Sequence, residues 1–416
     1  MTRTRRPYAE PRSRPPRHGA SRPNRRPSWV RRAGAVTVVF LVWLAWSIGG
    51  ALMAPGTDST AARVAEWARH HELGWVVSDL EQVQYQLAPP KVGGSLVGGI
   101  PLVSPDQPTP SQSGASITWP TLSPSLPRPM PSVSPARPTP SHSPGPAPIP
   151  PQVQPPLPSE GAWQTLVSLH GEPAIRAAFL RPDRLHTSYL VGVAWLDQKL
   201  VELVLHPGFQ VPGGSGWSQP FDVPASERDR LLATFNSGFT MVDANGGYWQ
   251  DGKTGAPLRQ GAASMVFYKD GHVDVVKWNA ATPGPDVAAV RQNLVLLVDH
   301  GTISPEVDSR TTRAWGITIG NHKYVWRTAL GVREDGSLVF VVGASMSVRT
   351  LANIVHDAGA VRAMELDINY SWTNFMTYTH PSKGVAVPHL LTRDEHPNPY
   401  RYLHPSSRDF VAVLAS

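Results

Sequence analysis

The sequence predicts an α+β protein in which a transmembrane helix and a proline-rich stalk precede one large, mostly antiparallel or mixed β-sheet domain. Three observations lead to this prediction. Apolar strand-like runs separated by glycine turns fill residues 160–416, which are numerous enough to bury a full core. Prolines are concentrated just before this region, with 20 of the 44 between residues 101 and 160. One helical pattern lies between two apolar strands within residues 338–369 and indicates a single strand-helix-strand unit.

The amino-terminal tail carries the excess positive charge. Residues 1–32 hold 11 arginines and one acid, Glu10, a balance of +10, whereas the whole chain is +7, so the remaining residues sum to −3. We therefore predict no nucleic-acid partner, because the basic character is confined to the tail. The chain has no cysteine, which excludes disulfides, thiolate metal sites and a cysteine nucleophile.

An apolar run without formal charge follows over residues 33–54, and a helix of this length crosses a bilayer. Because the arginines lie on one side only, we expect a cytoplasmic tail and an exported carboxy-terminal domain. The alternative is a cleaved signal peptide, but the run is long for one and Leu52-Met53-Ala54 is a poor cleavage site. The sequence thus predicts a single-pass protein of the cell membrane.

Two segments connect this anchor to the domain. Residues 57–90 are predicted to form a short juxtamembrane helical segment, with Ser59 as the cap of its first helix. Residues 101–158 are rich in proline, serine and threonine, a composition typical of disordered linkers with polyproline II character. We expect this linker to act as a stalk that holds the domain away from the membrane.

Hairpin signals recur in the domain at residues 160–416. Asp-Gly stands between apolar runs at Asp270-Gly271 and at Asp335-Gly336, which predicts two antiparallel hairpins. The strand-helix-strand unit comprises strand 338–342, a helix that Ser347 caps and Gly359 ends, and strand 361–369. In such parallel units, functional residues lie at the carboxyl ends of the strands.

The last strand of this unit carries three polar residues at alternate positions, Glu365, Asp367 and Asn369. Side chains on one face of a strand repeat every second residue, so two carboxylates and an amide are expected to share the face opposite Met364. This spacing favours a general acid and base pair, Asp367 and Glu365. The alternative is that a carboxylate only accepts hydrogen bonds from backbone donors of a neighbouring loop, or pairs with an arginine such as Arg327 or Arg362.

Several segments of the domain, taken in order and spacing, resemble the phosphodiester glycosidase family. They are Leu232-Ala233-Thr234-Phe235-Asn236-Ser237-Gly238-Phe239, Arg327-Thr328-Ala329-Leu330-Gly331 with Asp335-Gly336, and Leu351-Ala352 leading through Gly359-Ala360 to Leu366-Asp367. The resemblance covers about residues 175–380. It implies an α+β domain that hydrolyses the bond between the anomeric carbon of a sugar and a phosphodiester oxygen.

The resemblance also implies roles for individual residues. Asn236 matches the asparagine of the family's Asn-Gly-Gly-Phe-Phe turn, Arg327 the arginine of its Arg-Thr-Ala-Ile-Gly strand, and Asp367 the aspartate of its Leu-Asp-Gly-Gly-Gly-Ser loop. The match ends there, because large residues replace the three glycines. Tyr370 and Trp372 are expected to line the pocket and stack on a sugar, provided that the strand ends near Asn369. The alternative is that the replacement of the glycines has removed the hydrolytic site.

Other polar groups are weaker candidates. Arg291 and Asn293 stand at the entrance of an apolar strand, where they could hold a phosphate or sugar hydroxyl or only cap turns. The histidines of the carboxy-terminal region lack the spacing of a metal site. No metal site is predicted, and the sequence indicates no particular cofactor.

These observations predict a membrane-anchored, extracytoplasmic glycosidase. Asp367 and Glu365 are its predicted catalytic residues. The predicted substrate-binding residues are Asn236, Arg327, Asn369, Tyr370, Trp372, Arg291 and Asn293. The expected partner is a sugar phosphodiester or a cell-envelope polysaccharide. The alternative is a catalytically inactive wall-glycan-binding domain displayed on the stalk.

Overall fold

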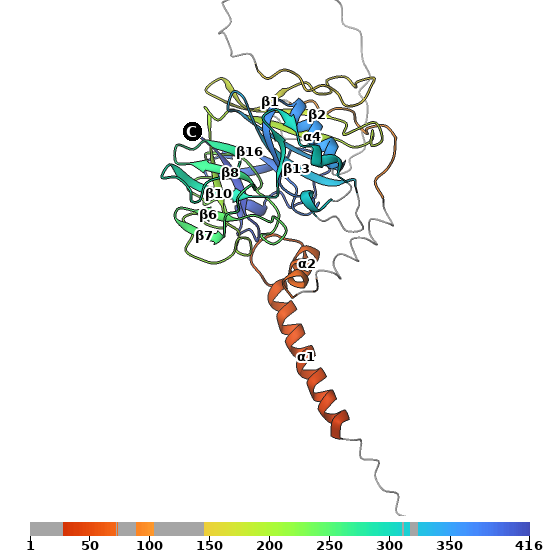
Figure 1. The fold of residues 1–416 in the computed structure, drawn as a ribbon, viewed down its shortest axis with the longest axis vertical. Helices are drawn as coiled ribbons and strands as arrows, with labels where there is room; N and C mark the ends of the chain where they lie inside the picture. Colours follow the sequence, from red (N-terminus) through yellow and green to blue (C-terminus); the bar gives the residue numbers. More distant parts are fainter. Residues whose placement is uncertain (1–27, 72, 74–88, 104–144, 310–311, 317–322) are drawn as a thin grey trace, which may run out of the picture. The chain divides into compact units, whose positions relative to one another are not determined.

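The computed structural model describes residues 28–71, 73, 89–103, 145–309, 312–316 and 323–416. The chain divides into two compact units, residues 1–53 and residues 54–416. The first contains helix α1, Ser28–Leu52 (Figure 1). An 18-residue window of α1, Ala35–Leu52, has a mean hydropathy of 2.0, so α1 is long and apolar enough to cross a membrane.

The second unit begins with helix α2, Thr60–His70, and continues into three β-sheets. The backbone N–H of Ala62 donates to Ser59 Oγ at 3.2 Å, as expected for the predicted cap. Residues 74–88 of the predicted juxtamembrane segment lie outside the described residues.

Among the described residues, every strand pair in the three sheets is antiparallel. The largest sheet has the order β1-β2-β3-β14-β13-β15-β11-β12. Its strands are β1 Gln164–Leu169, β2 Glu172–Leu180, β3 Val191–Leu196, β11 Leu296–Asp299, β12 Thr302–Ile303, β13 Val325–Arg333, β14 Leu338–Met346 and β15 Ala360–Glu365. The second, β7-β6-β10-β8-β9, comprises β6 Tyr248–Gln250, β7 Lys253–Ala256, β8 Ala263–Tyr268, β9 Val273–Lys277 and β10 Val287–Gln292. The third, β17-β16-β5-β18-β4, comprises β4 Val201–His206, β5 Leu231–Asn236, β16 Phe375–Ser382, β17 Val385–Leu390 and β18 Phe410–Ala415. Short 3₁₀ turns are at Pro305–Asp308, Thr312–Trp315 and Arg401–Leu403.

Both predicted hairpins are confirmed. The turn at Asp270-Gly271 joins β8 to β9, and the turn at Asp335-Gly336 joins β13 to β14. Gly271 has a φ of 90° and Gly336 a φ of 81°, the left-handed region that glycine enters without strain. These glycines therefore determine where each hairpin reverses.

The predicted strand-helix-strand unit is also present. Helix α4, Val348–Asp357, connects β14 to β15, and β13 lies between these two strands, antiparallel to both. β14 and β15 are therefore parallel to one another. Ser347 Oγ accepts the N–H of Thr350 at 3.0 Å and caps α4 as predicted, and Gly359 follows the helix with a φ of 95°.

Strand β15 ends at Glu365, earlier than the predicted end at Asn369. The cause is local, because the carboxylate of Asp367 accepts the backbone N–H groups of Ile368 and Asn369 and turns the chain. Met364 and Leu366 lie in the main core, as the alternation of side chains predicts.

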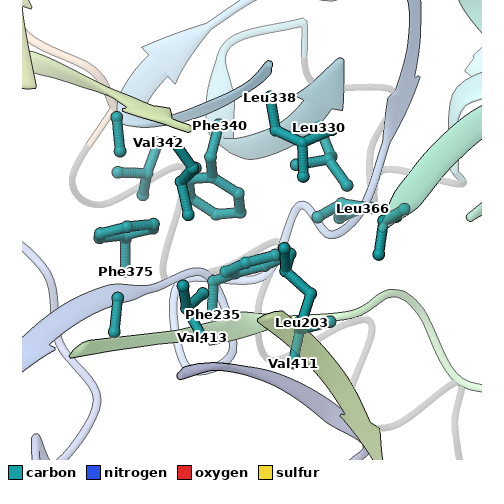
Figure 2. Packing of buried hydrophobic residues seen from close by; sticks show 14 of the residues in the cluster. Leu203, Phe235, Leu330, Leu338, Phe340, Val342, Leu366, Phe375, Val411 and Val413 are labelled. Atoms are coloured by element: carbon teal, nitrogen blue, oxygen red, sulfur yellow. The ribbon is translucent and has the colours of Figure 1, made fainter. Parts of the chain in front are cut away.

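The main core contains buried residues of all three sheets. Figure 2 shows the part of it that lies between the large sheet and the third sheet. Phe340 from β14 packs against Phe235 from β5, with ring centroids 4.9 Å apart, and against Phe375 from β16 at 5.2 Å. All nine residues of β14 are buried, which explains the apolar run Leu338–Val342 in its first half. The opposite face of the large sheet packs on α4.

We expect Phe340→Ala to lower the free energy of unfolding by about 3–5 kcal/mol, because it leaves a cavity among rings that cannot close over it. Phe340 is fully buried. Chemical denaturation of the variant measures the loss. Tyr400→Ala, at a position 45% exposed, is the control and should change stability by less than about 1 kcal/mol. Equal effects of the two substitutions would contradict this assignment of the core.

The described residues on either side of the proline-rich segment contact one hairpin of the large sheet. Residues 104–144 lie outside the described residues, but those on either side contact β1 and β2. Val103 N donates to Gln164 Oε1 at 2.6 Å, and a Cβ on Gly145 would lie 2.8 Å from Arg176 Cζ. Arg176 is the register partner of Thr165, the neighbour of Gln164. The stalk stays a prediction, and residues 54–70 and 89–103 belong to the same compact unit as the sheets.

Candidate active site

Asp367 occupies the position directly beyond the carboxyl end of β15. Its main chain pairs with β13, because Thr328 N donates to Asp367 O at 2.9 Å. Its carboxylate atom Oδ1 accepts the N–H groups of Ile368 at 2.7 Å and Asn369 at 2.9 Å. The residue is 2% exposed. Backbone pairing and the turn thus fix the orientation of this carboxylate.

The second carboxylate oxygen of Asp367, Oδ2, is buried and takes no part in this turn. Within the described part of the chain, no hydrogen-bond donor reaches Oδ2, and Arg408 Nη1 lies 3.8 Å from it. Burial raises the pKa of Asp367 to about 6, and the Arg408 guanidinium and the two backbone N–H groups oppose this shift. Such a carboxyl exchanges a proton near neutral pH, as a general acid or base must.

Asn236, at the end of β5, is connected to Asp367 through one residue. Asn236 Nδ2 donates to Thr328 Oγ1 at 3.0 Å, and Asp367 N donates to the same hydroxyl oxygen at 3.1 Å. Asn236 Oδ1 accepts the N–H of Asn374 at 3.3 Å. The structure therefore brings together Asn236 and Asp367, two of the three residues carried over from the family resemblance.

Arg327 and Glu365 form an ion pair with each other. Arg327 Nη1 lies 2.5 Å from Glu365 Oε1, both side chains are buried, and Arg327 Nε donates to Met346 O at 2.9 Å. Burial raises the pKa of Glu365 to about 7, against the opposing charge of Arg327. This geometry supports the ion-pair alternative for both residues. Their roles as catalytic carboxylate and as anion ligand stay predictions.

Arg291 and Asn293 hold the loop after β5 against β15. Asn293 Oδ1 accepts the N–H of Phe239 at 3.1 Å, and its Nδ2 donates to Glu365 O at 2.6 Å. Arg291 Nε lies 2.5 Å from Asp409 Oδ2, and Arg291 Nη2 donates to Phe239 O. Both side chains are fully buried. These contacts favour the turn-capping alternative over direct contact with a ligand.

Asn369 and Tyr370 lie on the turn that follows Asp367. Asn369 Oδ1 accepts the N–H of Ser371 at 2.9 Å and stabilises this turn. Tyr370 is 39% exposed, and its ring meets His396 edge-on at 5.2 Å between centroids. The strand ends before Asn369, as the pocket-lining prediction requires, so Tyr370 remains available to a sugar.

Trp372, unlike Tyr370, is not exposed, because its ring is buried under two arginines. It is 4% exposed, and the Cζ atoms of Arg401 and Arg408 each lie 4.5 Å from its ring centroid. A sugar could stack on this ring only if an arginine moved away. The contacts instead make Trp372 a cation–π support for the guanidinium next to Asp367.

The sequence interpretation missed the residues that immediately precede β18. Ser407, Arg408 and Asp409 are buried polar residues at the start of an apolar strand. Polar residues at the entrance of an apolar strand were the reason for predicting Arg291 and Asn293 as site residues. The same pattern before β18 would have predicted Arg408.

Buried polar atoms without a hydrogen-bond partner in the described part of the chain are frequent around Asp367. They include Ser237 Oγ, Glu365 Oε2, Asp367 Oδ2, Thr373 Oγ1, Asn374 Oδ1, Arg408 Nε and Asp409 Oδ1. Buried polar atoms in folded proteins are normally satisfied, so this concentration indicates a place where water or a polar ligand binds. Among the described residues, no group of three or more His, Cys, Asp or Glu side chains is arranged to hold a metal ion.

Comparison with known proteins gives one family match and several similar solved structures. Residues 229–382 match the family model described as phosphodiester glycosidase. One similar solved structure is the zebrafish N-acetylglucosamine-1-phosphodiester alpha-N-acetylglucosaminidase catalytic domain, auto-inhibited by its pro-peptide. It is 18% identical, with 61% of this chain and 87% of that chain covered and a TM-score of 0.39. Another is a hypothetical protein from Synechocystis, 13% identical, with 61% and 64% covered and a TM-score of 0.34. A search of curated proteins found no match. The family match extends from the residues before β5 to the end of β16 and contains all the residues predicted for the site, so this part of the chain is similar to phosphodiester glycosidases.

Proposed function

We propose that this protein is a membrane-anchored hydrolase that cleaves a glycosyl phosphodiester in the cell envelope. The observation that carries the proposal is the carboxyl of Asp367. It is buried, has a pKa of about 6, and has one oxygen free beside the guanidinium of Arg408, within a phosphodiester glycosidase domain.

In the proposed reaction, Asp367 acts as the general base. Ionised above about pH 6, its Oδ2 accepts a proton from a water molecule whose oxygen attacks the anomeric carbon. The bond between that carbon and the phosphodiester oxygen breaks, and the oxygen leaves with the electron pair as part of a phosphomonoester. Arg408 stabilises the negative charge of this leaving group, because a guanidinium binds phosphate oxygens through directed N–H groups.

The large residues that replace the family's glycines are compatible with an active site. Ile368 packs with a small apolar cluster of Phe239, Ala244 and Leu294. The ring of Trp372 lies beneath Arg408. These side chains are thus taken up by packing and do not pair with Asp367 Oδ2, which favours hydrolysis over a lost site. The substrate pocket must still differ from one built around a glycine-rich turn.

The second candidate is a domain that binds envelope glycan without cleaving it, which the missing glycine turn favours. The full chain in detergent, incubated with a synthetic N-acetylglucosaminyl phosphodiester and with isolated envelope polysaccharide, separates the two. Release of free reducing sugar supports the hydrolase. Retention on the polysaccharide with no released sugar from either material would overturn it.

We expect the domain to be exported and the tail to stay inside the cell, because the arginines flank only one end of α1. The chain has no cysteine, so single cysteines can report topology without background. A membrane-impermeant maleimide should label Val242→Cys, at a position 90% exposed, in intact cells. It should label Thr4→Cys only after lysis. The opposite pattern would reverse the orientation.

A further inference from the structure

The segment that follows α1, residues 54–70, folds as part of the domain. We call it the anchor-proximal segment. Arg63 organises it, donating to the carbonyl oxygens of Ala54, Gly56 at 2.7 Å and Asp58 at 2.9 Å. A Cβ on Gly56 would come within 2.4 Å of Pro405 O, so the segment packs directly on the loop before β18.

Two buried carboxylates of this segment pair with the two arginines that cover Trp372. Asp58 Oδ1 lies 2.8 Å from Arg401 Nη2, and Glu66 Oε1 lies 2.5 Å from Arg408 Nη2. The side chains of Glu66 and Arg408 are 4% and 8% exposed. Arg408 therefore lies between two carboxylates, with Glu66 in contact at Nη2 and Asp367 at a distance of 3.8 Å from Nη1.

We propose that Glu66 is a positioning residue of the active site: it holds the Arg408 guanidinium off Asp367 and so keeps that carboxyl available to take a proton from water. The inference rests on the proposed hydrolysis. It makes the anchor-proximal segment, which lies outside the family match, a part of the catalytic unit.

The charges around Asp367 decide the direction of the effect. Arg408 lowers the pKa of Asp367 and Asp243 raises it, while Glu365 is already paired with Arg327 and Asp409 with Arg291. Without the charge of Glu66, the counter-ion that remains nearest to Arg408 Nη1 is Asp367. Arg408 would then move onto Asp367, lower its pKa further and occupy the oxygen that receives the proton.

The test compares the pH dependence of kcat/KM in Glu66→Gln and in Asp58→Asn. Asp58→Asn is the matched control, because it breaks a buried ion pair of the same segment that does not touch Asp367. In the unaltered chain kcat/KM should fall as the pH drops below about 6, where Asp367 takes up a proton. In Glu66→Gln we expect this fall to begin about one pH unit lower and the kcat/KM at higher pH to be reduced. In Asp58→Asn the fall should stay at the same pH. Glu66→Asp keeps the charge and should restore the limb. Two results would overturn the proposal. One is an acid limb of the kcat/KM profile that does not move in Glu66→Gln. The other is a kcat/KM plateau in Glu66→Gln that is higher than in the unaltered chain.

A second readout works without catalysis and so separates this inference from the proposed function. Asp367→Asn should stabilise the otherwise unaltered chain at pH 8, because it removes a carboxylate that burial disfavours. In a Glu66→Gln background this stabilisation should shrink or reverse, since Arg408 then pairs with Asp367. An undiminished stabilisation would show that Glu66 does not hold Arg408 away, whether or not the chain hydrolyses any substrate.

Discussion

Asp367→Asn should reduce glycosyl phosphodiester hydrolysis by about 10²–10⁴-fold, the range for loss of a general base. Asparagine keeps the oxygen that accepts the N–H groups of Ile368 and Asn369, so the turn should survive. The amide cannot take a proton from the attacking water. The measurement is kcat/KM on a synthetic glycosyl phosphodiester at neutral pH.

The same substitution should make the protein more stable at alkaline pH. The pKa of Asp367 is about 6 in the folded protein and 3.8 as its ordinary value, so between these values the unfolded chain has lost a proton that the folded chain retains. The free energy of unfolding is therefore highest, as far as Asp367 is concerned, below about pH 4. It falls as the pH rises from there through about 6.

Asp367→Asn should thus match the unaltered chain at low pH and exceed its free energy of unfolding by up to about 3 kcal/mol at pH 8. Denaturation at pH 4 and pH 8 measures both limits. Full activity in the variant would remove Asp367 from the mechanism. A loss of stability at pH 8 would show that this carboxylate is a structural partner.

Local signals made much of the fold predictable. Asp-Gly at Asp270-Gly271 and Asp335-Gly336 marked hairpins whose glycines need a positive φ, and Ser347 marked the start of α4. Asp367 was identifiable because it alternates with Glu365 and Asn369 after an apolar run and matches the aspartate of the family's Leu-Asp-Gly-Gly-Gly-Ser loop. Each of these signals lies within a few residues of the feature that it predicts.

The rest of the site depends on contacts between distant segments, which periodicity does not encode. Arg408 meets Glu66 across 342 residues, and Arg327 meets Glu365 across 38. A pattern of polar residues on one strand face cannot distinguish a carboxylate that pairs with an arginine from one left free. Glu365 and Asp367 stand two residues apart, and only the packing of β13 and of the loop before β18 gives them different partners.

Breaking the buried ion pair of Arg291 and Asp409 should cause a large loss of stability. Their side chains are fully buried, and Arg291 Nε lies 2.5 Å from Asp409 Oδ2. We expect Asp409→Ala to lower the free energy of unfolding by about 3–5 kcal/mol, because it leaves an unpaired guanidinium that cannot lose its proton.

A second pair in the domain shows whether burial is the cause. Arg230 and Glu202 pair at 2.8 Å, with side chains 47% and 41% exposed. Water screens this pair, so Glu202→Ala should reduce stability by no more than about 1 kcal/mol. Arg291→Met in the Asp409→Ala background removes the stranded charge and should recover part of the loss, which denaturation of the single and double variants measures. If the double variant were no more stable than Asp409→Ala alone, lost packing would account for the effect. The stability loss would then not come from a buried, unpaired guanidinium, and the ion pair of Arg291 with Asp409 would not be what holds the loop before β18 next to Asp367.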